Sequence, residues 1–443
     1  MSTNAGMPPA DAARARLSTQ RWIQLVIGVV CMVMIANLQY GWTLFVTPIG
    51  MKYHWTRDAI QVSFTLFVAT ETWLVPIEGY LVDRFGPRAV TIAGGVLVGV
   101  GWSMNSRADS LPWLYVAQAI GGIGAGAVYG TCVGNALKWF PEQRGLAAGI
   151  TAAGFGAGSA LTVIPIAAMI RSSGYEATFL YFGLGQGLIV LALGWLLTQP
   201  DANNLAALPK PVAAAPVATQ EPRPLEKIGV SSGVPQVSPI KMLRTPVFWV
   251  MYLMFVLMAT GGLFLTQNLK QVTDDFKVAD VEVSFLWWAP TTATFALSLD
   301  RVLNGITRPF FGWVSDRLGR ENTMFIAFFT EAIGFLLLSW FGHAPVLFVV
   351  LSAVVFFGYG EIYSLFPSTS ADTYGWKYAS ANAGLLYTAK GTAALLLLLV
   401  ARLKAATSWE TVFVTFVCMN LTAAFLALVA LKPLRRRMLG RRT

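Results

Sequence analysis

Apolar stretches of about 20 residues recur along the whole sequence, and no other feature limits the fold as strongly. Each stretch is long enough to cross a hydrocarbon core of ~30 Å as an α-helix. Only 12% of the residues are charged, about half of what soluble proteins carry. We therefore expect an all-α polytopic membrane protein. The sequence predicts twelve spans: 22–47, 58–82, 89–106, 111–137, 146–170, 176–198, 247–270, 283–313, 322–341, 345–370, 381–402 and 410–431.

The basic residues indicate an orientation. Of 32 lysines and arginines, 21 fall on the tails and loops of one predicted face and 8 on the other, while Arg301, Arg308 and Lys390 lie inside spans. Positive residues accumulate on the cytoplasmic side of membrane proteins. Both termini are therefore expected in the cytoplasm, with the chain in a plasma membrane of the bacterial inner-membrane type. The terminal LRRRMLGRR is interpreted as an anchor to anionic lipid headgroups.

Other function classes find little support. Cys31, Cys132 and Cys418 lie far apart in apolar windows, and the only histidines, His54 and His343, fall in predicted loops. Neither a metal site nor a cofactor is expected, and no enzyme motif is present. The +10 net charge is a topology signal, so no nucleic-acid partner is expected. Residues 1–20 are polar, so the first apolar run is predicted to be a retained span rather than a cleaved signal.

A segment rich in Pro, Ala and Val, residues 201–239, separates six predicted spans from the other six. Its composition is typical of a flexible linker. We expect a tail, two six-helix bundles joined by a cytoplasmic linker, and a basic tail, divided at 1–21, 22–199, 200–245, 246–433 and 434–443. A monomer is expected in the lipid bilayer.

The two halves share a repeated motif. GYLVDRFGPR (79–88) and GWVSDRLGRE (312–321) both contain Gly-x-x-x-Asp-Arg-x-Gly, 233 residues apart. The first glycine allows close helix approach, the aspartate can face a helix N-terminus or a basic residue, and the last glycine permits a tight turn. The motif predicts gating loops that hold one face shut in one state: Gly79, Asp83, Arg84 and Gly86, and Gly312, Asp316, Arg317 and Gly319.

With this doubled motif, the chain resembles the major facilitator superfamily over nearly its full length. The resemblance implies twelve transmembrane helices arranged as two six-helix bundles, the major facilitator fold. It also implies a central substrate cavity and alternating access.

Charges inside predicted spans are expensive in a membrane and mark functional sites by default. Lys390 lies near the middle of its span, in LLYTAKGTAALLLLLV. Arg308 precedes Pro309, where we expect a break in the helix. Asp300, Asn304 and Arg308 are spaced to share one helix face, and Asp300 is expected to neutralise Arg301. Lys390 and Arg308 are thus interpreted as two uncompensated cations in a wet central chamber, suited to a small dianion or to one carboxylate plus a second acceptor.

Aromatic residues near mid-membrane strengthen this interpretation, because phenol hydroxyls donate hydrogen bonds to carboxylates and rings exclude water. They are Tyr40, Trp42, Tyr129, Tyr359, Tyr363 and Tyr387.

The segments NLQYGWTLF, AGAVYG, KWFPEQRGLAAGITAAGFG, NGITRPFFGWVSDRLGR, SLFPSTSAD and YTAKGTA resemble the oxalate/formate antiporter family. The resemblance implies that a small carboxylate lies between Arg308 and Lys390. It places Gln39, Tyr40, Tyr129, Tyr363 and Thr307 at other lining positions. Tyr359 and Tyr387 stand where the family has tryptophans, Phe155 where it has a tyrosine, and Glu361 where its best-known member has a small residue.

The leading hypothesis is therefore a secondary transporter that exchanges small organic anions of the oxalate/formate type. A proton-coupled monocarboxylate symporter remains open, with Glu361 or Asp300 carrying the proton. A membrane sensor with a transporter-like fold also remains open. The other membrane acids, Glu71, Glu331 and Glu78, are candidates for structural pairs, and the exact carboxylate stays undetermined.

Overall fold

The computed structural model describes residues 9–201, 236–284 and 290–440, and these residues are almost entirely helical. The elements are α1 Pro9–Tyr40, α2 Thr43–Tyr53, α3 Arg57–Trp73, α4 Val75–Phe85, α5 Pro87–Asn105, α6 Leu111–Trp139, α7 Arg144–Gly194, α9 Pro239–Leu243, α10 Pro246–Asp275, α11 Thr292–Leu318, α12 Arg320–Phe341, α13 Pro345–Tyr359, α14 Ile362–Tyr374, α15 Ala379–Ala406, α16 Trp409–Leu426, the π-helical turn η1 Ala427–Leu431 and α17 Lys432–Gly440.

Each of the twelve predicted spans lies wholly or mostly on these helices. Within the described ranges, nine helical segments are long and apolar enough to cross a membrane. The remaining three spans correspond to α5, to the first part of α7 and to α11. Glycines are frequent in the first two of these, and charged residues in α11, which lowers their hydropathy without preventing a buried helix.

The eighth span differs from the prediction at two points. Helix α11 begins at Thr292, nine residues later than predicted, because Thr291 just before it pairs with Glu282 in an isolated antiparallel bridge. The expected break at Pro309 is also wrong, since α11 continues through this proline to Leu318. A single missing N–H leaves the rest of a long, packed helix intact.

Three other spans are interrupted instead. Gly41 and Trp42 separate α1 from α2, Leu74 separates α3 from α4 just before Pro76, and Gly360 with Glu361 separates α13 from α14. A Cβ at Gly41 would lie 2.7 Å from the Asn37 carbonyl oxygen, so only glycine fits there. Such breaks free backbone groups inside the bundle, where a substrate or a gate can use them.

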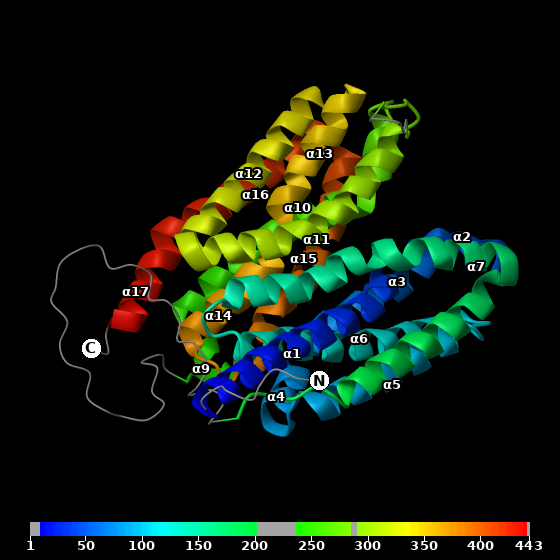
Figure 1. The fold of residues 1–443 in the computed structure, drawn as a ribbon. Helices are drawn as coiled ribbons and strands as arrows, with labels where there is room; N and C mark the ends of the chain where they lie inside the picture. Colours follow the sequence, from blue (N-terminus) through cyan, green and yellow to red (C-terminus); the bar gives the residue numbers. More distant parts are fainter. Residues whose placement is uncertain (1–8, 202–235, 285–289, 441–443) are drawn as a thin grey trace.

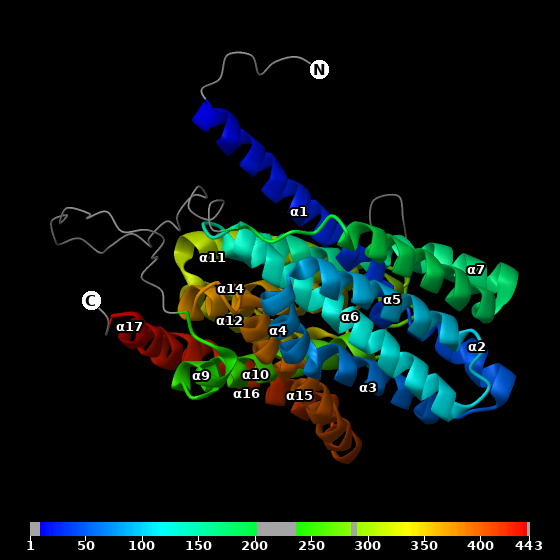
Figure 2. The same cartoon turned by 90° about the horizontal axis from the view of Figure 1, so that it is seen from below.

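The helices form two groups, α1–α7 and α10–α17, that lie together at one end and diverge toward the other (Figure 1). The converging end carries α4, α9 and α17 (Figures 1 and 2), while the ends near α2 and α13 are apart (Figure 1). Between the groups, α7 packs against α11 and α14, and α15 packs against α3, α4 and α6. We call the converging end the closed end.

Small residues bring the groups into backbone contact at the closed end. A Cβ on Gly79 would lie 2.6 Å from the Ser380 carbonyl oxygen on α15. A Cβ on Gly312 would lie 2.1 Å from the Gly145 carbonyl oxygen on α7. Each motif glycine therefore permits an approach between groups that any larger residue would block.

The motif aspartates reinforce these contacts across the groups. Asp83 accepts a hydrogen bond from the Ala381 N–H near the start of α15 (3.0 Å) and pairs with Lys138 (2.7 Å). Asp316 accepts from the N–H groups of Gly145 and Leu146 at the start of α7 (3.0 and 2.9 Å). Each carboxylate thus caps a helix N-terminus of the opposite group, where the helix dipole favours negative charge.

A second ionic network ties α7 to α11, α12 and α14. Arg320 pairs with both Asp316 (2.7 Å) and Asp372 (2.8 Å), and Arg144 also pairs with Asp372 (2.8 Å). The last glycine of each motif shapes the turn that follows its helix. Gly86 and Gly319 have φ values of +85° and +87°, as a tight turn requires.

The motif arginines point away from these contacts between the groups. Arg84 and Arg317 are exposed and lie over Phe85 and Trp313 of their own helices.

The predicted linker lies largely outside the described residues, as do 1–8 and 441–443. Just after it, the Val237 N–H donates to the Tyr374 carbonyl oxygen (2.8 Å). The interpretation of the C-terminal basic cluster as only a lipid anchor is wrong for Arg435. This side chain is buried, and its guanidinium donates to Thr373 and pairs with Glu321.

Substitution of Asp83 by Ala should loosen the closed end, because it removes a helix cap and leaves Lys138 without its carboxylate. A cap contributes about 1 kcal/mol, which corresponds to roughly a fivefold change in population. We expect N-ethylmaleimide to label a cysteine at the buried Ser380 about five times faster in Asp83→Ala, measured in a Cys418→Ser background. The exposed Asp109, changed to Ala, is the matched control. Equal labelling rates in the two variants would contradict the role given to Asp83.

Candidate functional site

A cavity of about 730 Å³ lies between the two helix groups, toward the diverging end. It is lined from α1–α3 on one side and from α10, α11, α13 and α15 on the other. The lining residues are Gln39, Tyr40, Trp42, Thr43, Arg57, Gln61, Phe64, Thr65, Val68, Leu263, Thr266, Gln267, Asn268, Lys270, Gln271, Asp274, Arg301, Asn304, Tyr359, Ala394, Leu395 and Leu397. The cavity is large enough for a small ligand and is mixed in polarity.

Lys390 lies in the first half of α15, 1% exposed, and every one of its N–H donors is used. Its Nζ donates to Gln39 Oε1 (2.9 Å), to the Tyr387 hydroxyl (2.9 Å) and to both carboxylate oxygens of Glu71 (3.0 and 3.2 Å). The Tyr387 hydroxyl in turn donates to Glu71 Oε1 (3.1 Å). Lys390, Tyr387 and Glu71 therefore form a closed ring of hydrogen bonds across α15 and α3.

The expectation that Lys390 is uncompensated is wrong. Its ammonium forms an ion pair with Glu71, which is fully buried on α3. The physical reason is the cost of a bare charge in a dry helix bundle, which a carboxylate of opposite charge offsets. The sequence signal was present, because an acid deep in the second span and a base deep in the eleventh each need a partner.

Arg308 on α11 has a different environment. Its guanidinium donates to the Ala152 carbonyl oxygen (2.7 Å) and to Asn304 Oδ1 (2.6 Å), and it lies 4.4 Å from the centre of the Tyr363 ring. Its Nε donates to no acceptor, and no carboxylate of the described residues lies within ion-pair distance. The predicted face shared by Asp300, Asn304 and Arg308 thus brings Asn304 to Arg308, while no acid of the described residues pairs directly with its positive charge.

Aromatic rings connect the two cations. Tyr129 stacks on Tyr387 with ring centres 4.5 Å apart, and Tyr363 meets the edge of Tyr387 at 6.2 Å. Phe155 packs against both Tyr40 and Tyr129 at 5.4 Å, and the Lys390 ammonium lies 5.5 Å from its ring centre. The rings come from α1, α6, α7, α14 and α15, so an aromatic box surrounds the space between the charges.

Neither cation lines the cavity, and the expectation of a wet chamber around them does not describe this conformation. Four residues line the cavity and also contact the cations or the rings beside them: Gln39, Tyr40, Asn304 and Tyr359. We call these four residues the cavity floor. Gln39 accepts a hydrogen bond from Lys390, and Asn304 accepts one from Arg308, so each cation is bonded directly to a residue of the cavity floor. The buried cations and the cavity therefore belong to one site, and the side chains of the cavity floor separate them.

Several other predicted residues lie around this site. Asp300 is fully buried, and its carboxylate lies 3.9 Å from Arg301, as expected, while Arg301 lies 4.7 Å from the ring centre of Tyr40. The Thr307 hydroxyl donates a hydrogen bond to the backbone carbonyl oxygen of Leu303, one turn earlier in α11 (2.7 Å).

The break between α13 and α14 adds two further groups. The Tyr359 hydroxyl exchanges a hydrogen bond with Tyr363 (2.8 Å). Glu361 lies at the break itself, fully buried, and its carboxylate oxygens have no hydrogen-bond partner among the described residues.

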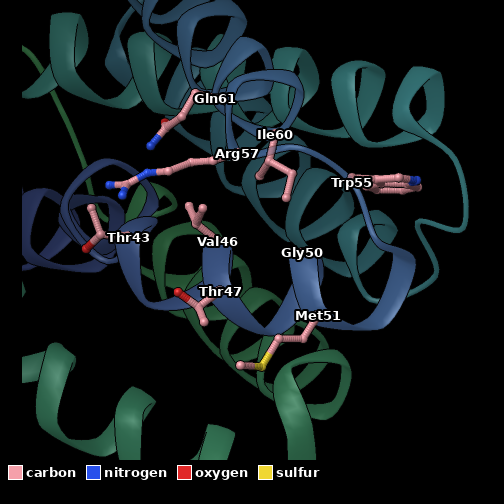
Figure 3. Close-up of a pocket in the computed structure, with 9 residues that line it drawn as sticks. All are labelled: Thr43, Val46, Thr47, Gly50, Met51, Trp55, Arg57, Ile60 and Gln61. Atoms are coloured by element: carbon pink, nitrogen blue, oxygen red, sulfur yellow. The ribbon is translucent and has the colours of Figure 1, made fainter.

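A smaller pocket of about 340 Å³ lies at the turn between α2 and α3. Figure 3 shows the Arg57 side chain extending toward Thr43, with Gln61 beside it. Because these three residues also line the large cavity, the small pocket adjoins that cavity. Arg57 is exposed there and places a positive charge where an anion would enter.

Comparisons with known proteins agree with this architecture. The family model of the Major Facilitator Superfamily matches residues 25–297 and 269–442. The "Oxalate:formate antiporter" of Oxalobacter formigenes is 34% identical over 389 residues, which cover 87% of this chain and 85% of that protein.

Two solved structures show the same fold at 14% identity each. One is the proton:xylose symporter XylE, with a TM-score of 0.67 over 94% of this chain and 96% of that one. The other is the human organic anion transporter MFSD10, with a TM-score of 0.64 over 95% and 100%.

The ion pair makes a stability prediction. Lys390→Met leaves the Glu71 carboxylate buried without its cation, and breaking such a pair costs about 3–5 kcal/mol. We expect the single variant to melt well below the wild type in detergent, and Lys390→Met with Glu71→Gln to recover most of the loss. A double variant that melts no higher than Lys390→Met would contradict the pairing.

Proposed function

The chain belongs to the Major Facilitator Superfamily and to its oxalate/formate antiporter family, and on that premise we propose that it exchanges small carboxylate anions across a membrane by alternating access. The observation that carries the proposal is the Arg308 guanidinium, buried beneath the cavity with spare donors and without an ion-pair partner among the described residues. A guanidinium binds a carboxylate through two parallel hydrogen bonds, so Arg308 is the anion's main partner.

The remaining binding residues follow from their places around the two cations. Lys390 supplies the second positive group, and the aromatic box excludes water and sharpens the electrostatic attraction. The proposed substrate-binding set is Arg308, Lys390, Gln39, Tyr40, Tyr129, Tyr363, Tyr387, Tyr359 and Thr307. Gln39, Tyr40, Asn304 and Tyr359 form the floor that an anion passes to reach the cations.

Exchange rather than net flow follows from the same charge. Moving an unbalanced Arg308 through a dry gate is costly, and an anion bound beside it removes most of that cost. The site therefore reorients readily when loaded and slowly when empty. Asp300 pairs with Arg301 at 3.9 Å, so these two opposite charges add no net charge to the moving site.

The closed end supports a gating role for the repeated motif. Asp83 and Asp316 cap helices of the opposite group in this state, so both caps must break when the end opens. We assign Gly79, Asp83, Gly86, Gly312, Asp316 and Gly319 to the gate directly. Arg84 and Arg317 are exposed, and we assign them to the membrane or solvent surface of the same loops.

Location follows from charge placement. The excess of basic residues on the terminal face favours both termini in the cytoplasm of a bacterial inner-membrane-type bilayer. The closed end is then cytoplasmic, and the cavity opens outward. One chain supplies both cations and the whole cavity, so a monomer is sufficient, built from six-helix bundles at about 22–199 and 246–433.

A proton-coupled monocarboxylate symporter is the second candidate, and the unpartnered buried carboxylate of Glu361 favours it. Proteoliposomes with no internal anion separate the two functions. Uptake of labelled formate driven by an imposed pH gradient would support symport, whereas uptake that needs an internal carboxylate would support exchange.

Arg308→Ala should lower exchange of labelled formate or oxalate in proteoliposomes by at least about 30-fold, because it removes the one buried cation of the described residues that has no ion-pair partner. The matched control is Arg402→Ala at the exposed far end of α15, which should exchange at the wild-type rate. Circular dichroism and the elution volume in detergent check that both variants fold. Exchange by folded Arg308→Ala at the control rate would refute the proposed site.

A further inference from the structure

We infer that Glu71 is a built-in counter-ion that makes this a site for singly charged carboxylates, and that it disfavours dianions such as oxalate. The inference rests on the proposed function and names the charge class of its substrate. It starts from the contrast between the two buried cations, of which Lys390 already has a carboxylate partner and Arg308 has none.

The geometry leaves no free donor on Lys390. An ammonium has three N–H groups, and four acceptor atoms lie within 3.2 Å of this one: two oxygens of Glu71, Gln39 Oε1 and the Tyr387 hydroxyl. A substrate oxygen can reach Lys390 only by displacing one of them. The Glu71 carboxylate is additionally held by the Tyr387 hydroxyl, so it stays beside the ammonium even if one hydrogen bond is exchanged.

Arg308 keeps capacity for a guest. Its two acceptors, the Ala152 carbonyl and the Asn304 amide oxygen, are neutral, and its Nε has no acceptor among the described residues. Carboxylate oxygens can replace neutral acceptors at a guanidinium with a gain in energy. Of the two buried cations, Arg308 is therefore the one that offers a free positive charge to a substrate.

A count of charges gives the preference. Arg308, Lys390 and Glu71 together carry one net positive charge, which a monoanion neutralises. A dianion would leave the three side chains and the guest with one net negative charge inside a dry aromatic box, where uncompensated charge is expensive. Without the Glu71 charge, the same balance would favour the dianion.

Other titratable groups lie around the ring and bear on this count. Tyr129 and Tyr387 face Glu71 as hydroxyls, and Asp300 is matched by Arg301. Glu78 on α4 lies close to Glu71, because a Cβ on Gly126 would lie 2.6 Å from the Glu71 carbonyl oxygen and 2.9 Å from Glu78 Oε2. Its carboxylate makes no ion pair within the described residues, and the Glu78→Gln variant tests whether its charge enters the count. Glu361 makes no ion pair with Arg308 within the described residues, and it therefore needs a variant of its own in the test.

The ion pair also joins the two helix groups, since Glu71 is on α3 and Lys390 is on α15, 319 residues apart. Opening the closed end moves α4 away from α15, to which Gly79 and Asp83 now bind it. Glu71 is thus placed to stay paired with Lys390 while the closed end is shut and to separate from it when that end opens. This gives a reason for an acid at this position beyond simple packing.

The test compares oxamate and oxalate, which have nearly the same size and shape but carry one and two negative charges. Their affinities are measured from the thermal stabilisation that they give the purified full-length protein in detergent, so no transport is required. The proteins are the wild type, Glu71→Gln, Glu71→Gln with Lys390→Met, Glu361→Gln, and Glu78→Gln as the matched control for loss of a buried acid.

We expect the wild type to bind oxamate at least about tenfold more tightly than oxalate, and Glu71→Gln to reverse that order. The double variant restores a single net positive charge, and it should again prefer oxamate even though its affinities are lower. Glu78→Gln should keep the wild-type order.

Three results would overturn the inference while leaving carboxylate binding intact: a wild type that prefers oxalate, an unchanged order in Glu71→Gln, or a reversal in Glu361→Gln instead. Stabilisation of no protein by either anion would have a different meaning, because it would refute the proposed function and the inference together.

Discussion

A bare charge in the middle of an apolar helix bundle is expensive, and the centre of this protein is organised around that cost. Lys390 is stabilised by a full set of acceptors that includes the Glu71 carboxylate. Arg308 is held by neutral oxygens and an aromatic face alone. The site is therefore asymmetric, with one cation neutralised inside the protein and one left for a guest.

The rest of the architecture serves to bring these groups together and to close one end over them. Both cations come from the second helix group, while Glu71, Gln39 and the Ala152 carbonyl come from the first. The repeated glycines let the groups touch, and the repeated aspartates cap helices across the interface. The glycine and aspartate contacts thus hold the closed end shut, whereas the buried charges beneath the cavity determine which anions can bind.

The interrupted helices matter for the same reason. The breaks at Gly41, Leu74 and Gly360 lie in the helices that carry Gln39, Glu71 and Tyr359. A break lets one helix present side chains to the cavity on one part and pack at the closed end on the other. Small-molecule carriers of this architecture place their sites where helices are discontinuous, because free backbone groups and local bending are available there.

The sequence by itself determined the spans, the repeat of Gly-x-x-x-Asp-Arg-x-Gly and the presence of Arg308 and Lys390 within helices. These properties depend on local composition and spacing, since a helix must be apolar over about 20 residues and a turn needs its glycine. The face shared by Asn304 and Arg308, and by Tyr387 and Lys390, was also readable, because helical periodicity fixes neighbours three and four residues apart.

Only the tertiary structure decided which buried charges are paired. Glu71 and Lys390 are 319 residues apart, and no local pattern says which acid in twelve helices meets which base. Helix periodicity gives the face of each side chain but leaves open which helix lies opposite and at what depth. That choice depends on how the two groups pack, and it turned an expected pair of free cations into one free cation and one neutralised ion pair.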